Sequence, residues 1–140
     1  MMKSRIAGIA AATFFLACGD STGVEFAFPE VTGTYDYTAT VTGVPELSIT
    51  GTLSITDDSR DTDAFTGSFT IRLSGGGITP VTLNGSIASA RVTETGNILF
   101  DFELPEYRHQ GTISGRTISG TYVLIGTTSS FNGNFTAIRR

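Results

Sequence analysis

The chain has 140 residues, with an ordinary hydrophobic content of 39% and a low charged fraction of 16%, which suits one domain with one core after a leader. Its net charge is -4, and its nine basic residues include Lys3 and Arg5, which leaves seven arginines against thirteen carboxylates in the body of the chain. Since Lys3 is the only lysine, the composition excludes lysine-based chemistry such as Schiff bases and P-loops, and it disfavours nucleic-acid binding, which needs clustered cations.

The first segment has the layout of a secretory signal. Met1–Arg5 is short and basic, and the twelve residues Ile6–Ala17 carry no charge. Twelve residues are too few to cross a hydrocarbon layer about 30 Å thick as a helix. We therefore predict a signal peptide over residues 1–17.

The run Phe15-Leu16-Ala17-Cys18-Gly19 resembles the lipobox of bacterial lipoproteins, with Ala17 and Cys18 matching and Phe15 and Leu16 departing from the usual residues. The resemblance implies cleavage before Cys18, lipid on its sulfur and a lipid-anchored protein of the cell envelope. In that family an aspartate directly after the cysteine retains some lipoproteins in the inner membrane, so Gly19 implies the outer membrane, facing the periplasm or the surface. An ordinary signal peptide with an incidental Cys18 is the alternative.

Residues 18–30 are rich in small and polar side chains and predict a tether between the lipid and the folded domain. Phe26 and Phe28 interrupt that polarity, and we expect them to pack against the end of the domain or to begin a short strand. Cys18 is the only cysteine, so no disulfide can form within the chain. The folded domain is predicted over residues 31–140.

A five-residue pattern recurs seven times in this domain: apolar, polar, glycine, polar, apolar. Alternation of this kind indicates β-strands with one buried face, and every glycine falls on that face. A glycine inside a strand costs roughly 0.5–1 kcal/mol relative to alanine, so seven of them favour a crowded, sharply coiled barrel over a flat sandwich. The copies begin at Val31, Ile49, Phe65, Leu83, His109, Ile118 and Phe131.

Eight strands follow in chain order, with no helix-length apolar period. They are predicted over residues 33–41, 47–55, 65–73, 81–92, 98–102, 107–113, 118–124 and 131–138. The apolar register shifts by one at Ala88, which predicts a β-bulge. Because every connection is short, we predict an all-β, eight-stranded, antiparallel up-and-down β-barrel, with a β-sandwich as the alternative. An outer-membrane barrel, with its apolar face turned to lipid, is disfavoured by the lipobox, the glycines and the Arg139-Arg140 end.

In pattern, the meander with its repeated apolar-x-Gly-x-aromatic strands resembles the calycin group, meaning lipocalins and especially avidins. The resemblance implies a lumen able to hold a small apolar ligand. The chain has no tryptophan, and the glycine-x-tryptophan of lipocalins corresponds here only to Gly33-Thr-Tyr35. No ligand-binding residue is therefore carried over from that group.

Tyrosine and histidine side chains on the predicted inner face are the candidate ligand-binding residues, because their polar groups can orient a ligand within an apolar pocket. We add the two phenylalanines of the strand that lacks a glycine repeat. The set is Tyr35, Tyr37, Phe100, Phe102, Tyr107, His109 and Tyr122. The alternative is that these polar groups reach the barrel mouths while phenylalanines fill the lumen.

The sequence offers little for catalysis or metal binding. His109 is the only histidine, without the cysteine or histidine partners that a zinc site normally needs, and no Gly-x-Ser-x-Gly elbow is present. The acidic loop Asp57–Asp63 lacks EF-hand spacing and contains Arg60. We predict no cofactor, no metal site and no catalysis, with a hydrolase as a weak alternative.

The functional hypothesis from sequence is a lipid-anchored, non-catalytic envelope protein that binds a small hydrophobic ligand or an envelope partner. The alternative is a purely structural lipoprotein with a filled barrel. Ligand, protein partner and oligomeric state are left open by the sequence.

Overall fold

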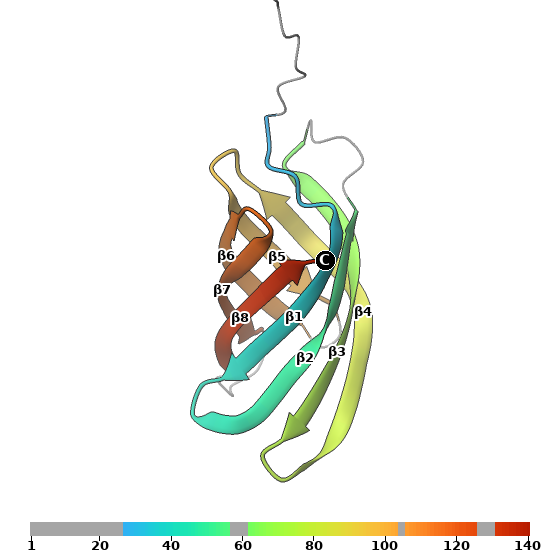
Figure 1. The fold of residues 1–140 in the computed structure, drawn as a ribbon, viewed down its shortest axis with the longest axis vertical. Helices are drawn as coiled ribbons and strands as arrows, with labels where there is room; N and C mark the ends of the chain where they lie inside the picture. The colour runs from blue at the N-terminus through green and yellow to red at the C-terminus, as the bar shows by residue number, and fades with distance from the viewer. Residues whose placement is uncertain (1–26, 57–61, 104–105, 126–130) are drawn as a thin grey trace, which may run out of the picture.

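The computed structural model describes residues 27–56, 62–103, 106–125 and 131–140, and it shows a closed all-β barrel (Figure 1). The strands are β1 (Gly33–Val41), β2 (Val44–Thr56), β3 (Ala64–Gly75), β4 (Ile78–Val92), β5 (Asn97–Phe102), β6 (Tyr107–Ser114), β7 (Thr117–Leu124) and β8 (Asn132–Arg139). Each strand pairs antiparallel with the next, and β8 pairs with β1. The predicted up-and-down barrel is confirmed. The sandwich alternative is wrong, because this last pairing closes the sheet and leaves no edge.

The connections between strands alternate between two ends of the barrel. In Figure 1, β1, β3, β5 and β7 end at the lower end of the barrel. The strands β2, β4, β6 and β8 run the other way, toward the upper end, where residues 27–32 lie. Every strand and every buried core residue of the described structure falls within residues 31–139, so the chain from Gly19 onward contains all of the described barrel. In the described ranges, no helix is long and apolar enough to cross a membrane.

Alternation along the strands places the apolar side chains inside the barrel. On β1, for example, Tyr35, Tyr37, Ala39 and Val41 are buried, while the intervening threonines and Asp36 are exposed. His109 and Asp101 are the polar or charged residues that are buried in the described part of the chain. The apolar face therefore lies inward, as predicted, and the inverted arrangement is not observed.

The repeated glycines allow neighbouring backbones to approach closely on the inner face. A Cβ atom at Gly51 would overlap the carbonyl oxygen of Thr70 and lie 2.7 Å from the Cα of Ile71, both on the neighbouring strand. Side-chain crowding contributes at Gly85, where ring atoms of Phe69 lie 3.1 Å from the Cβ position. Close approach of neighbouring backbones thus accounts for more of these glycines than side-chain crowding does.

A β-bulge interrupts β4, as the apolar register predicts. The β4–β5 ladder shifts between Ala88 and Arg91, and Ser89 has a φ of 50°. Strand ends differ from the prediction by a few residues, since Val44 and Pro45 belong to β2 and not to the preceding turn. Phe28 packs against the core as expected, whereas Phe26 and Cys18 lie outside the described residues.

Candidate functional site

The lumen is built around His109, which β6 presents inward with no exposed surface. Its imidazole stacks on Phe100 of β5, with ring centroids 4.5 Å apart and 7° between the planes. Phe102 lies 4.3 Å away by the same measure, and Phe135 of β8 meets the ring edge-on at 5.0 Å. The single histidine is therefore enclosed by phenylalanines from strands on both sides.

Both ring nitrogens of His109 have hydrogen-bond partners. Nδ1 lies 3.1 Å from the carbonyl oxygen of Tyr107, and Nε2 lies 2.9 Å from the hydroxyl of Tyr37. A carbonyl oxygen can only accept, so Nδ1 carries the proton, and Nε2 then accepts the hydrogen bond that Tyr37 donates. This assigns the tautomer from the geometry of the partners.

Burial sets the charge state of this cluster. It lowers the pKa of His109 to about 4, against the opposing effects of the Tyr107 carbonyl and the Asp101 charge. Burial also raises the pKa of Tyr122 to about 12, with a smaller contribution from Tyr107. The pKa of Tyr37 is raised well above its ordinary value, mainly by burial. At neutral pH all of these groups are uncharged.

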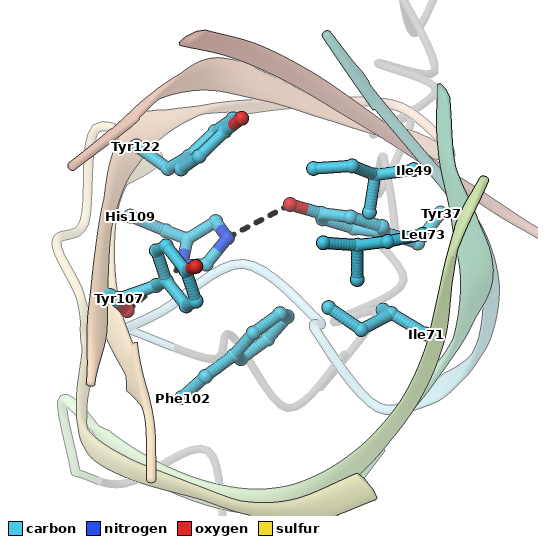
Figure 2. A pocket seen from close by; sticks show the side chains of 8 residues that line it. All are labelled: Tyr37, Ile49, Ile71, Leu73, Phe102, Tyr107, His109 and Tyr122. Atoms are coloured by element: carbon cyan, nitrogen blue, oxygen red, sulfur yellow. Dashed lines mark hydrogen bonds between the residues drawn. The ribbon is translucent and has the colours of Figure 1, made fainter. Parts of the chain in front are cut away.

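A cavity of about 10 Å³ lies beside the cluster (Figure 2). Its lining residues Leu73 and Tyr107 lie near the lower ends of β3 and β6, so the cavity lies toward the lower end. Such a volume holds roughly one water-sized group. Apolar side chains of β2 and β3 form one wall, and Figure 2 shows them facing the aromatic and imidazole side chains across the lumen. The lining residues are Tyr37, Ile49, Ile71, Leu73, Phe102, Tyr107, His109 and Tyr122.

Five of the seven predicted ligand-binding residues line this cavity; Tyr35 and Phe100 do not. Tyr35 lies toward the upper end of the barrel, where its hydroxyl donates to the carbonyl oxygen of Val31 at 2.7 Å. Phe100 is fully buried and packs against the face of His109. Cys18, the predicted lipidation site, lies outside the described residues.

The apolar wall of Ile49, Ile71 and Leu73 was not among the predicted site residues. Alternation places all three on the inner face, but it gives them no feature that separates them from other core residues. Only the closure of the barrel, which sets β2 and β3 opposite β6, shows that they face His109.

Apolar side chains continue from the cavity to the ends of the lower hairpins, and we call this set the lower rim. Its members are Val44, Leu73, Ile78, Val81 and Leu83. Leu73 and Leu83 are half-buried against the core, whereas Val44, Ile78 and Val81 expose 37%, 44% and 45% of their surfaces. Val81 pairs with Leu73 and therefore shares its face of the sheet. The lower end thus offers apolar surface next to the small recess beside His109.

Charged groups lie outside the lumen. Asp101 on β5 is 4% exposed and accepts two hydrogen bonds from Arg108 of β6, at 3.0 and 2.9 Å. Asp63, at the described end of the acidic loop, pairs with Arg91 at 2.8 Å. Within the described ranges, no three histidine, cysteine or acidic side chains gather as metal ligands would.

No protein-family model matches the chain, and no curated protein matches it. Among solved structures, the chain is similar to that of EF1p2_mFAP2b bound to DFHBI. The TM-score is 0.53 at 14% sequence identity, and the match covers 78% of this chain and 93% of the other. This similarity shows the fold. It agrees with the closed barrel that the strand pairing defines.

Proposed function

We propose that the protein is a lipid-anchored, non-catalytic protein of the cell envelope that binds a small hydrophobic molecule at the lower end of its barrel. The observation that carries the proposal is the recess beside His109, which combines an apolar wall with a few polar side-chain groups and shares Leu73 with the lower rim. Binding pockets for small molecules combine these elements. The similarity to a barrel that is bound to DFHBI supports it at the level of fold.

The arrangement of the two ends suits this function. Residues 27–32, which precede β1, lie at the upper end, and the recess lies toward the lower end (Figure 1). A lipid on Cys18 would tether the chain through the upper end. Ligand would then have access to the lower end without passing the anchor.

The size of the recess limits how a ligand is held. With room for roughly one water-sized group, the lumen accepts only the leading group of a ligand unless side chains move. The remainder of the molecule would lie against Leu73 and the lower rim. Burial of that apolar part provides the binding free energy, at about 25 cal/mol per Å² of surface removed from water.

Binding of N-phenyl-1-naphthylamine, a neutral probe whose fluorescence rises in apolar surroundings, tests the proposal. We expect the chain from Gly19 onward to bind it with a Kd on the order of micromolar. Leu73→Trp fills the entrance and should weaken binding at least about tenfold, because the probe and the indole compete for the same space. Val123→Trp adds the same side chain at a residue that is 43% exposed on the outer wall, and it should leave binding unchanged. Equal affinity in all three proteins, or no binding at all, contradicts the proposal.

A second candidate function is that of a structural lipoprotein with a solid barrel. The observation that favours it is the same small volume, since phenylalanines and tyrosines leave only about 10 Å³ in the lower lumen. In this case the outer Ser/Thr face would be the functional surface. Absence of probe binding, together with retained anchoring through Cys18, would favour this candidate.

A further inference from the structure

We infer that the recess selects an uncharged hydrophobic molecule whose leading group donates a hydrogen bond, such as a long-chain alcohol, and that it discriminates against the corresponding carboxylate. The inference rests on the proposed function and names the chemical class of its ligand. Three features of the recess carry it: its hydrogen-bond acceptors, its lack of charge and its volume.

Two hydroxyl groups in the recess already donate hydrogen bonds to acceptors of the protein. Tyr37 donates to Nε2 of His109 at 2.9 Å, and Tyr122 donates to the carbonyl oxygen of Thr40 at 2.8 Å. A hydroxyl has one proton and two lone pairs, so each of these oxygens has only acceptor capacity left for a ligand. The dashed line in Figure 2 marks the first of these bonds within the lumen.

The core holds the acceptors of these two hydrogen bonds in place. His109 cannot turn freely, because its ring stacks on Phe100 and its Nδ1 proton is donated to the carbonyl oxygen of Tyr107. Thr40 belongs to β1, and its carbonyl oxygen forms part of the barrel wall. The acceptor character of the recess is therefore built into the fold.

Tyr107 is the remaining hydroxyl in the lining. It is half-buried, and no described residue hydrogen-bonds to its hydroxyl, so this group can either donate or accept. Its ring contacts Tyr122 and Phe131, with centroids 5.9 and 6.0 Å away. Removing this hydroxyl should leave a recess that only accepts, which makes Tyr107→Phe a useful variant.

Among the residues that the structure describes, no arginine, aspartate or glutamate lines the recess, and His109 is neutral above its pKa of about 4. A carboxylate entering here would lose its water and meet the oxygen lone pairs of Tyr37 and Tyr122, with only the Tyr107 hydroxyl to donate and no cation to compensate. An alcohol would lose less water and would donate to Tyr37 or Tyr122. The electrostatics thus favour the neutral donor.

The volume of the recess also favours an alcohol over a carboxylate. The recess holds roughly one water-sized group, and a hydroxyl is of that size. A carboxylate has two oxygens and needs more room. A linear alcohol can therefore place its oxygen beside Tyr37 while its chain remains against the apolar wall of Ile49, Ile71 and Leu73.

Displacement of N-phenyl-1-naphthylamine by three ligands of equal carbon number, 1-decanol, 2-decanone and decanoate at pH 7.5, tests this inference on the chain from Gly19 onward. We expect 1-decanol to bind most tightly, about tenfold better than 2-decanone, which only accepts, and decanoate to bind most weakly. If decanoate or 2-decanone binds as well as 1-decanol, the inference is wrong while the proposed function stands. If neither the probe nor any of the three ligands binds, the proposed function itself fails.

Two variants connect the preference to the named hydroxyl groups. Tyr107→Phe should raise the ratio of the 2-decanone Kd to the 1-decanol Kd severalfold, because it removes the one lining hydroxyl whose proton is not donated to any described residue. Tyr35→Phe is the matched control: it removes a buried inner-face hydroxyl at the other end of the barrel and should leave the ratio unchanged. Thermal unfolding would confirm that both variants fold. An unchanged ratio in Tyr107→Phe, or an equal change in the control, contradicts the acceptor mechanism.

Discussion

Tyr37 of β1 donates a hydrogen bond to His109 of β6 across the lumen, over 2.9 Å and between residues 72 positions apart in the chain. The two strands do not pair with each other, so this bond links opposite walls of the barrel. It satisfies two polar groups that are 2% and 0% exposed. This buried pair thus contributes to the stability of the barrel. It also uses the Tyr37 proton, so that the Tyr37 oxygen can only accept a hydrogen bond from a ligand in the recess.

The buried histidine predicts a loss of stability in mild acid. Its pKa is about 4 in the folded chain and near the ordinary 6.5 in the unfolded chain. Above 6.5 both states are neutral at this residue, and as the pH falls toward 4 only the unfolded state takes up the proton. The free energy of unfolding should therefore decrease through this window by up to about 3 kcal/mol, as urea denaturation between pH 7.5 and 4 would measure.

The double variant Tyr37→Phe/His109→Phe separates this effect from the titration of carboxylates. It replaces both partners together, so no buried polar group is left without its partner across the lumen. We expect its stability to change less over the same pH range than that of the natural chain, and the difference reports His109. Parallel pH profiles for the two proteins would show that His109 is not the source of the acid sensitivity.

The sequence was sufficient to predict the barrel and its inner face, because alternation and turn residues are local signals. Tyr37, Tyr107, His109 and Tyr122 could be nominated for the same reason. The hydrogen bonds of these residues could not be predicted. The closed barrel sets β1 opposite β6, and only this arrangement shows that Tyr37 is the tyrosine that contacts His109. The burial of Asp101 was also missed, because alternation places it on the outer face of β5, whereas its enclosure depends on the neighbouring strands and Arg108.

Replacement of Gly51 should destabilise the barrel more than replacement of a turn glycine. In Gly51→Ala the new methyl group would overlap the carbonyl oxygen of Thr70, so β2 and β3 must separate, at a cost of about 3 kcal/mol. Gly43 has a φ of 79° with nothing within 4 Å of the Cβ position. Gly43→Asn should cost less than about 1 kcal/mol, because asparagine tolerates this conformation. Thermal or urea unfolding of the two variants provides the comparison, and similar losses would contradict the close-approach role.

The ion pair between Asp101 and Arg108 should matter more than the exposed pair between Asp36 and Arg140. Arg108→Ala leaves the Asp101 carboxylate, whose side chain is only 5% exposed, without its cation, and should clearly lower the free energy of unfolding. Arg140→Ala breaks a pair whose side chains are 58% and 60% exposed, and it should change the free energy of unfolding much less. Urea denaturation at pH 7.5 measures both. If high salt weakened the Asp101 pair as strongly as the exposed one, the protected position assigned to it would be wrong.

Lipid anchoring makes a separate prediction about Cys18, the only cysteine in the chain. Cys18→Ala should abolish both incorporation of labelled palmitate and recovery in the membrane fraction, because it removes the sulfur that we propose receives the lipid. Phe15→Leu changes the preceding lipobox position toward the residue usual in that family, so it should retain both properties and serve as the control. A Cys18→Ala protein that still incorporates palmitate would contradict the anchor. Loss of the label without loss of probe binding by the barrel would show that anchoring and ligand binding are independent properties of the chain.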